Sequence, residues 1–566
     1  LTLLAIFAYL AVRTALFLVT DYAWYEKVLA ACLLLCEAFI IVHGFGYYLN
    51  IYHVVKNVER RIPDTEGLPE LSTYPPVAII TSCYKEPLAV TTDTMICFYN
   101  LTYPNKYLYY LDDTRYDLPN QDAAKMAAYR KSIDELCQRI GVNVFRRKWH
   151  GAKAGMINDW LEFADGRYRE GFRFRPYQNK PLAGKEKYVI VFDADMNAFP
   201  DMVEHLVQIM ESNPKLAFVQ TPQYYTNFDV NRVARAAGLQ QAIFYEYICE
   251  GKSSQDAMFC CGTNVIFRRE ALMDVGGFDH TSITEDFATS LKFHMRGWSS
   301  SFLNRVCAFG LGPEDLGGYF KQQFRWALGT VGLFRTIVIA FCKNPRALPA
   351  AKWWEYTLSG THYYVGWTFF ILAVSPMLFI FFGIPRYFAR PDIFVLVFAP
   401  YIFLSFALFT YTLQRRSYRL GEVLMGLLLN SISFPVYLKA SFLGTIGVRG
   451  SFGITPKGQS ATMPLSNFWP QLTLATVAFS AVIWGAMRLY YEREPIVAPG
   501  VGRRKQRCRQ AFGQLLAEVE EIAAPLEVGF SPFVAGEFAQ DRHSCVCLFL
   551  IELFPEAGEL FALQVG

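Results

Sequence analysis

The chain has 566 residues, of which 53% are hydrophobic, 16% are aromatic and only 18% are charged. This length is too great for one compact domain, and the apolar composition is typical of a membrane protein that also carries an aqueous domain. The net charge of +4 is too small to indicate a partner nucleic acid. The 13 cysteines form no two CxxC pairs at zinc spacing, which argues against a structural zinc site or a disulfide framework.

Two apolar segments open the chain, at about residues 1–20 and 27–49. Each is long enough to cross a hydrocarbon core of about 30 Å as a helix. The sequence KNVERR follows at 56–61, and its excess of positive charge predicts a cytoplasmic exit. We therefore expect residues 1–52 to form N-terminal transmembrane helices.

The segment from about Pro75 to Pro345 has the pattern of an α/β domain. Short apolar runs alternate with polar helical stretches, and three runs read as buried strands, namely PVAIITS, YVIVFDAD and KLAFVQT. Such alternation predicts a largely parallel sheet with ligands at its strand ends. We assign residues 53–350 to this domain and its interfacial helices.

Apolar segments return at residues 356–384 and 393–413, and the basic sequence QRRSYR follows the second. The positive charge predicts that this loop shares the cytoplasmic side with the α/β domain. The next apolar region, 423–448, contains Pro435 with several Ser and Gly residues, which favours a broken or interfacial helix. A last span is predicted at 471–491, so that residues 351–492 form the second membrane region.

The predicted crossings leave the side of the C-terminal tail open. If the tail is cytoplasmic, one more crossing is needed than the clear apolar segments supply. Either residues 423–448 cross, or a segment is missing from the sequence, or the tail lies outside. Residues 493–566 are expected to form a small C-terminal domain, which opens with the basic sequence GRRKQRCR.

Three predicted strands end in polar or acidic residues. Asp193-Ala-Asp195 follows YVIVF, Asp112-Asp113 follows KYLYYL, and Tyr84-Lys-Glu86 follows PVAIITSC. A lone DxD is more often a pair of solvated loop acids, but two carboxylates at a strand end can also hold a divalent cation against a diphosphate. The coincidence of three such ends at one sheet edge favours a ligand site.

Three further motifs each allow two readings. In SITEDFATS, Glu285 and Asp286 either occupy the first turn of a helix capped by Thr284 or include a catalytic carboxylate. In HGAKAG, Lys153 either approaches a phosphate or starts a surface helix. In QQFRW, Trp326 either offers a face to a sugar ring or lies on an amphipathic helix at the membrane surface.

The order of these motifs resembles that of the processive family 2 glycosyltransferases, and within them the bacterial cellulose synthases. The resemblance covers roughly residues 75–491. It is carried by the acidic pairs, the TED sequence and QxxRW, and further by TPQYY, FCCGTNVIFRR and the gating-loop-like FGITPK at 452–457. It implies a cytoplasmic GT-A domain flanked by transmembrane helices that form a polysaccharide channel, with a gating loop near 446–467.

The resemblance also implies a role for each motif residue. The donor-binding residues would be Tyr84, Glu86, Asp112, Lys153, Asp193 and Arg325, and the metal ligand, for Mg²⁺ or Mn²⁺, would be Asp195. Asp286 would be the general base of an inverting transfer. The acceptor site would be bordered by Trp326, Gln322, Cys261 and Glu285, and the gating loop would act through Phe452, Thr455 and Lys457.

The resemblance implies a multi-pass protein of the bacterial inner membrane that takes UDP-glucose as donor and a nascent glucan as acceptor, with export partners beyond the lipid bilayer. KQQFRW and the Thr-Arg after Asp113 depart from the usual cellulose synthase pattern, so a mixed β-1,3/β-1,4 glucan and a β-1,3 glucan stay alternatives to a cellulose-like product. A non-catalytic transporter that senses a nucleotide is a more distant alternative.

The basic start of the tail has two readings. Arg503 and Arg507 match the Arg-x-x-x-Arg half of a cyclic di-GMP-binding signature, but the second half of that signature is absent from the tail. The segment is either a divergent sensor of this activator or a basic stretch that meets anionic lipid.

Overall fold

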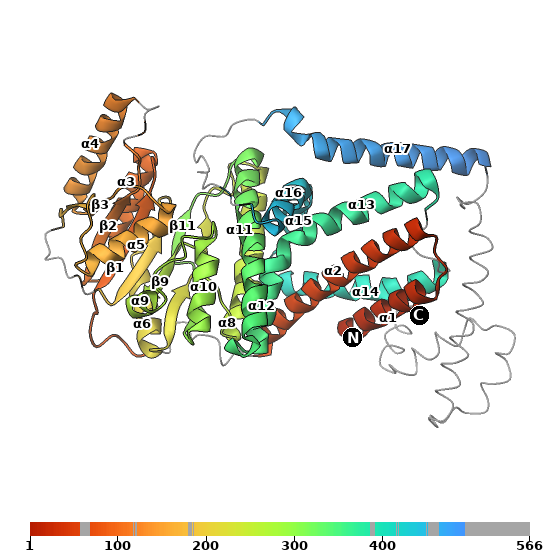
Figure 1. Ribbon diagram of the computed structural model, residues 1–566, viewed down its shortest axis with the longest axis horizontal. Coiled ribbons are helices and arrows are strands. Elements are labelled where there is room, and N and C mark those ends of the chain that lie inside the picture. The colour runs from red at the N-terminus through yellow and green to blue at the C-terminus, as the bar shows by residue number, and fades with distance from the viewer. Residues whose placement is uncertain are drawn as a thin grey trace, which may run out of the picture. The chain divides into compact units, whose positions relative to one another are not determined.

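The computed structural model describes residues 1–56, 68–116, 118, 122–178, 184, 186–384, 391–414, 416, 418–448, 450 and 463–492. Apart from Leu18–Asp21, these residues belong to one compact unit that contains an α/β domain and a group of apolar helices (Figure 1). The predicted fold class, membrane α-helical plus α/β, is confirmed. The predicted domain limits stay a prediction.

The α/β domain is built on an eight-stranded sheet in the order β10-β7-β9-β5-β1-β2-β3-β4. Its strands are β1 Val77–Cys83, β2 Lys106–Asp112, β3 Asn143–Arg146, β4 Arg173–Arg175, β5 Tyr188–Phe192, β7 Leu216–Gln220, β9 Val265–Arg268 and β10 Ser299–Phe302. A second, three-stranded sheet consists of β6 Asn197–Ala198, β11 Ala308–Gly310 and β8 Tyr224–Tyr225.

The central strands β5, β1, β2 and β3 are parallel, as the alternation of strands and helices predicts. β9 is an exception, because it runs antiparallel to both of its neighbours, β5 and β7. Its first residue, Val265, pairs with Val191 and Gln220 near the ends of those strands. β9 therefore starts at the edge where β5 and β7 finish, and the loop that precedes it lies at that edge.

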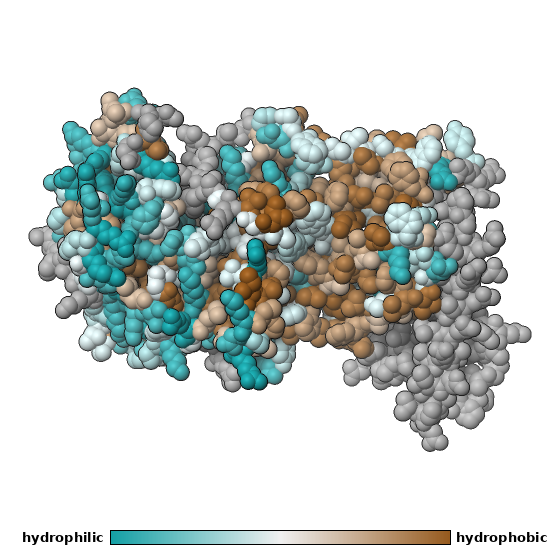
Figure 2. Space-filling model, in the orientation of Figure 1, coloured by the Kyte–Doolittle hydropathy of each residue, from teal (hydrophilic) through white to brown (hydrophobic). Residues whose placement is uncertain are grey.

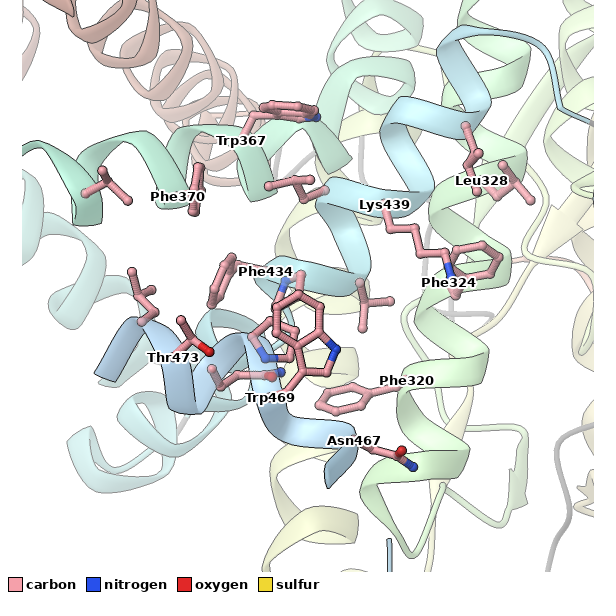
Figure 3. Close-up of a pocket in the computed structure, with 18 of the residues that line it drawn as sticks. Phe320, Phe324, Leu328, Trp367, Phe370, Phe434, Lys439, Asn467, Trp469 and Thr473 are labelled. Carbon is pink, nitrogen blue, oxygen red and sulfur yellow. The ribbon is translucent and has the colours of Figure 1, made fainter. Parts of the chain in front are cut away.

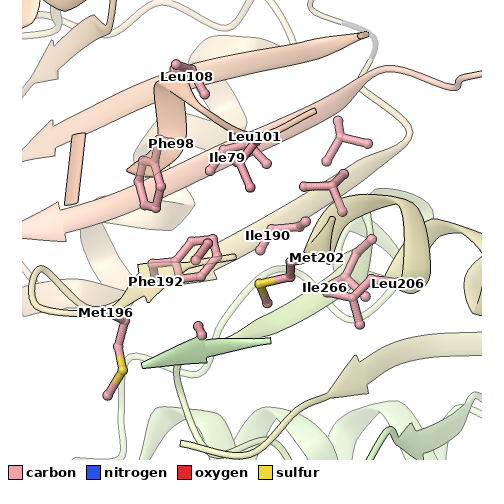
Figure 4. Packing of buried hydrophobic residues seen from close by; sticks show 14 of the residues in the cluster. Ile79, Phe98, Leu101, Leu108, Ile190, Phe192, Met196, Met202, Leu206 and Ile266 are labelled. Carbon is pink, nitrogen blue, oxygen red and sulfur yellow. The ribbon is translucent and has the colours of Figure 1, made fainter. Parts of the chain in front are cut away.

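Helices cover both faces of the sheet. The helices α3 Leu88–Tyr99, α4 Ala123–Ile140 and α6 Met202–Ser212 cover one face, and α5 Ala152–Ala164, α9 Arg269–Asp274 and α10 Glu285–Met295 cover the other. Successive residues of a strand point to opposite faces, so Ile79 packs with Phe98 and Met202 (Figure 4), whereas Ile80 packs with Trp160 on the other side. The residues of both cores are buried, and this packing holds the strands, and with them the strand ends of the candidate site, in place.

The remaining helices are mostly long and apolar. They are α1 Thr2–Val19, α2 Trp24–Lys56, α7 Arg232–Ile243, a π-helix Phe244–Cys249, α8 Glu250–Ser254, α11 Leu316–Lys343, α12 Ala350–Thr361, α13 Val365–Phe382, α14 Pro391–Gln414, α15 Leu420–Ile432, α16 Phe434–Thr445 and α17 Trp469–Glu492. Short 3₁₀ turns lie at Pro345–Ala347, His362–Tyr364 and Leu465–Phe468.

Six helical segments in the described part of the chain are long and apolar enough to cross a membrane, or seven if a bent pair counts as one span. The bent pair is α15 and α16, whose axes differ by 51°, so the broken helix predicted around Pro435 is confirmed. α11 also meets the length and composition of a span, although its sequence predicted only a helix at the membrane surface. Figure 2 shows apolar side chains over these helices and polar ones over the sheet domain.

Candidate active site

Three of the polar strand ends lie side by side. β1 is the parallel neighbour of both β2 and β5, with Cys83 paired to Asp112 and Thr81 paired to Phe192. Tyr84, Asp112 and Asp193 therefore leave the sheet at one edge on adjacent strands. The carboxyl edge of a parallel sheet is where α/β proteins bind ligands.

Asp112 is buried and held in place by its neighbours. Its Oδ2 accepts hydrogen bonds from Nε of Arg146 at 2.6 Å and from the hydroxyl of Tyr116 at 2.7 Å. The backbone N–H of Thr114 donates to its Oδ1 at 3.2 Å. The next residue, Asp113, pairs with Arg147 at 3.2 Å, and burial raises the pKa of Asp113 to about 6. The acids at this strand end are thus rigid.

Aromatic and cationic groups gather beside Tyr84. The Arg115 guanidinium lies 3.3 Å from the ring centroid of Trp149 and 5.9 Å from that of Tyr84. The Lys85 ammonium lies 5.6 Å from the Tyr84 centroid, and the carbonyl of Glu86 accepts a hydrogen bond from Tyr129 at 2.9 Å. Flat rings with positive charge suit a planar base and its phosphates. Sequence reasoning missed Arg115 and Trp149, which belong to no motif.

Lys153 links the DxD sequence to the loop before β9. It lies in the first turn of α5, forms an ion pair with Asp193, and donates to the carbonyl of Gly262 at 2.8 Å. The backbone N–H of Asp193 donates to the hydroxyl of Thr263 at 2.8 Å. The Asp193 side chain is 44% exposed whereas Asp195 is 3% exposed, so Asp193 faces the open side of the site.

Asp286 occupies the first turn of α10, directly against Gly262. One oxygen, Oδ1, accepts the backbone N–H of Phe287 at 2.8 Å, and a Cβ added to Gly262 would lie 2.9 Å from the other, Oδ2. Gly262 also has a φ of +85°, which disfavours any other residue. Thr284 stands at the N-cap position but its side chain makes no capping hydrogen bond, and it instead faces Gly329 of α11.

The carboxylates beside Lys153 are held in an environment that disfavours their charge. Burial raises the pKa of Asp286 to about 6 and that of Glu285 to about 7, where the neighbouring Asp286 adds to the effect. Burial alone would lower the pKa of Lys153, but Asp193, Glu285 and Asp286 raise it overall. Acidic groups therefore outnumber the cations among them, and the site favours an added positive charge.

The donor set fits a hard divalent cation. Among the described residues there is no group of three or more His, Cys, Asp or Glu side chains that could hold a metal by itself. Mg²⁺ is commonly held by one or two carboxylates together with substrate phosphates. The strand-end acids Asp193 and Asp195, in surroundings that already carry excess negative charge, meet that requirement.

The QQFRW sequence lies on α11 and reaches the site from one side. The Gln322 amide contacts the hydroxyl of Tyr225. The positive charge of Arg325 offsets part of the rise in the pKa of Glu285. Trp326 is half-buried on the same helix. The backbone N–H of Cys261 donates to the Gln220 side chain at 2.8 Å, which fixes the loop that carries Gly262.

Five predicted site residues cannot be placed. Phe452, Thr455, Lys457, Arg503 and Arg507 lie outside the described residues. Of the other predicted residues, Asp193, Glu285 and Asp286 lie around Lys153, and Gln322, Arg325 and Trp326 lie on α11.

Comparisons with known proteins agree with this geometry. The profile of "Glycosyl transferase family 2" matches residues 78–276, and that of "Glycosyl transferase family group 2" matches residues 188–413. Over residues 78–413 the chain is therefore similar to the family 2 glycosyltransferases. Both profiles cover the DxD strand and the loop before β9.

The chain also resembles cellulose synthases. It is 25% identical over 486 residues to putative cellulose synthase 2 of Komagataeibacter xylinus, covering 83% of this chain and 29% of that protein. It is 28% identical over 358 residues to the UDP-forming cellulose synthase catalytic subunit of Pseudomonas fluorescens, covering 61% and 42%. The chain thus spans less than half the length of these relatives.

A solved structure is also similar at lower identity. The mannosyltransferase PcManGT of Pyrobaculum calidifontis, in complex with GDP-Man and Mn²⁺, is 16% identical with a TM-score of 0.45, covering 74% of this chain and 99% of that one.

Proposed function

We propose that this protein is a processive, inverting β-glucan synthase, which transfers glucose from UDP-glucose to a growing glucan with cellulose-like β-1,4 linkages and moves the product across the membrane. The observation that carries the proposal is the placement of Asp286, a half-buried carboxylate with a raised pKa, beside the Lys153–Asp193 pair at the edge of the sheet. A general base next to a phosphate-binding group is the arrangement that sugar transfer from a nucleotide requires.

In this proposal the donor lies along the edge formed by β5, β1 and β2. The uridine meets Tyr84 and Asp112, and Glu86 borders it. Lys153 and Arg325 face the diphosphate, and Asp193 orients Lys153 through their ion pair. The rigid hold of Arg146 and Tyr116 on Asp112 supports a positioning role for that acid, because a preformed site loses less entropy when the donor binds.

Asp195, with Asp193 beside it, would hold Mg²⁺ or Mn²⁺. When bound, such a cation neutralises the negative charge that develops on the leaving diphosphate. Lys153 and Arg325 would stabilise the same negative charge on the diphosphate, because both are cations close to the acids of the site. The negative charge of the carboxylates would then be neutralised only when the metal ion and the donor are bound.

Asp286 takes the proton from the acceptor hydroxyl as that oxygen attacks the anomeric carbon of the donor sugar. Its position at a helix start would by itself lower its pKa and weaken it as a base. Burial acts in the opposite direction and prevails, so the pKa of about 6 suits a base that works near neutral pH. Glu285 stands next to it as a structural partner.

The acceptor glucan is bordered by Trp326, Gln322, Cys261 and Glu285, with the Trp326 ring as a stacking face for the terminal sugar. Phe452, Thr455 and Lys457, outside the described residues, are proposed to close over the bound donor. The six candidate spans support a membrane location. We propose the bacterial inner membrane, with the catalytic domain cytoplasmic, cyclic di-GMP acting at Arg503 and Arg507, and export partners on the far side.

The test is a donor screen with the purified protein in nanodiscs, with Mg²⁺ or Mn²⁺ and with or without cyclic di-GMP. We expect UDP release and polymer formation from UDP-glucose, and little from other nucleotide sugars. Linkage analysis of the polymer then separates a β-1,4 product from a mixed β-1,3/β-1,4 or a β-1,3 product. Binding of UDP-glucose without transfer under every condition would favour a nucleotide-sensing protein instead.

A further inference from the structure

A cavity of about 1330 Å³ lies between α11, α13, α16 and α17 (Figure 3). It is larger than the 300–1,000 Å³ usual for pockets that bind small ligands. None of Lys153, Asp193 or Asp286 lines it, so it is separate from the candidate active site. It touches that site at one residue, Arg325.

Most of the cavity wall is apolar, and one side of it follows one face of α13. Trp367, Phe370, Val374, Met377 and Phe381 recur at helical spacing on this face. From Trp367 to Phe381 the helix rises about 21 Å, at about 1.5 Å per residue. That length exceeds one leaflet of a membrane core, about 15 Å, so an extended acyl chain fits along the wall.

The other end of the cavity is positively charged. Lys321 and Arg325 lie one turn apart on α11, and Lys439 of α16 lies opposite, with its ammonium 5.8 Å from the ring centroid of Phe324. No acidic residue is among the described residues that line the cavity. Lys321 and Lys439 also make no ion pair within the described part of the chain. An anionic headgroup would complement this end.

The wall offers few hydrogen-bond partners to the hydroxyls of a glycan. Its uncharged polar side chains are Asn467, Gln471 and Thr473. The amide of Gln471 already donates to the carbonyl of Ile432 at 2.9 Å, and the Trp367 indole donates to Ser441 at 3.1 Å. A sugar chain buried here would leave many hydroxyls without partners, which is unfavourable, whereas an acyl chain has none to satisfy.

We propose that this cavity binds an anionic membrane phospholipid, with the headgroup phosphate between Lys321 and Lys439 and an acyl chain along α13. The lining helices α11, α13 and α17 all belong to candidate membrane spans, so the molecules that surround the cavity in the membrane are lipids. Because Arg325 both lines the cavity and acts on the charge of Glu285, the bound lipid adjoins the active site. Lipid binding itself does not depend on the proposed sugar transfer.

The test is photo-crosslinking of the full chain in nanodiscs that contain a phosphatidylglycerol or a phosphatidylcholine with a diazirine in the acyl chain, followed by peptide mapping. We expect labels on α13 and α17, several-fold stronger for phosphatidylglycerol. The double variant Lys321→Gln/Lys439→Gln should lose that preference. Lys343→Gln, an exposed lysine of the same helix outside the cavity, should keep it.

A second pair of variants tests the acyl-chain path. Val374→Trp places a large side chain in the apolar part of the cavity and should remove the labels on α13. Val395→Trp changes a residue of α14 that is 58% exposed and should leave those labels in place. Equal labelling of α13 and α14 without headgroup preference would overturn the proposal in favour of ordinary surrounding lipid. Displacement of the label by a soluble gluco-oligosaccharide would overturn it in favour of a glycan path. Retained UDP binding by each variant establishes that it has folded.

Discussion

Gly262 gives the active site its most demanding backbone position. Its φ of +85° places it in the left-handed region, and a methyl group there would lie 2.9 Å from Oδ2 of Asp286. We expect Gly262→Ala to lower the rate of sugar transfer by about 10²-fold or more, the lower end of what a general base contributes. UDP release assays measure the rate.

Gly276→Ala is the matched control for this substitution. Gly276 has a similar φ of +80°, but a Cβ there would meet nothing within 4 Å. Both alanines suffer the same backbone strain, so a shared modest loss of thermal stability is expected. Equal loss of activity in the two variants would contradict the proposed contact between Gly262 and Asp286.

Glu285 links the site to the pH dependence of stability. The pKa of about 7 in the folded protein lies above the value of about 4.3 for a free glutamate, so the folded state binds more protons between these two pH values. Stability therefore falls as pH rises through this window, and the full penalty applies above about pH 7. The source of the penalty is burial of a carboxylate next to Asp286.

Glu285→Gln should accordingly raise the melting temperature by a few degrees at pH 8 and by nothing near pH 4, in metal-free buffer. Transfer activity should fall, since we propose that Glu285 borders the acceptor. Glu135→Gln, a 64% exposed side chain of α4, is the control and should change neither property. A melting temperature that stays the same at pH 8 would show that Glu285 is not destabilised by burial.

At the scale of elements, α10 is held at its middle and near its end. At its middle, the Ser290 hydroxyl accepts the N–H of Cys260 at 2.8 Å and donates to the carbonyl of Asp286 at 2.8 Å. Towards its end, His294 forms hydrogen bonds with Tyr356 of α12 at 2.7 Å and with Ser300 at 2.8 Å. Burial lowers the pKa of His294 well below its usual value, so this link is between neutral groups.

Tyr356 thus joins α10 to the apolar helix α12, and we infer that it positions α10. Its ring also stacks on Phe287, with centroids 5.5 Å apart. Tyr356→Phe keeps the stack but loses the hydrogen bond to His294, and we expect kcat to fall several-fold while KM for the donor changes little. Steady-state kinetics measure both constants.

Tyr103→Phe is the control for this prediction. Tyr103 is an equally buried tyrosine whose hydroxyl donates to the carbonyl of Pro75 at 2.7 Å, away from α10. It should alter stability without the selective change in kcat. A rise in KM with kcat unchanged for Tyr356→Phe would mean that Tyr356 serves donor binding instead.

The elements themselves were predictable where hydropathy is simple. The spans predicted at residues 1–20, 27–49, 393–413 and 471–491 each coincide with one helix, because a long apolar run allows little else. The orientation of β9 was not predictable. A four-residue apolar run reads the same in either direction, and only its pairing with β5 and β7 shows that it starts at the site.

At the scale of the whole molecule, the motif residues were predictable from sequence, because a carboxylate that follows an apolar strand is recognised within a few residues. The parts missed were Arg115, Trp149 and the contact of Gly262 with Asp286, which depend on segments that are distant in sequence. Within the described residues, six helical segments, or seven if α15 and α16 form one span, are long and apolar enough to cross a membrane.

The central claim is that Asp286 is the base of a glycosyl transfer, and the most direct test is a single-turnover reaction of the full chain with radiolabelled UDP-glucose in nanodiscs. The account predicts that Asp286→Asn binds the donor with near-normal affinity but transfers sugar about 10²- to 10⁴-fold more slowly than the wild type, the range a general base supplies. Transfer at an unchanged rate in Asp286→Asn would contradict it, and so would a wild-type protein that binds the donor but never forms a glycosidic bond.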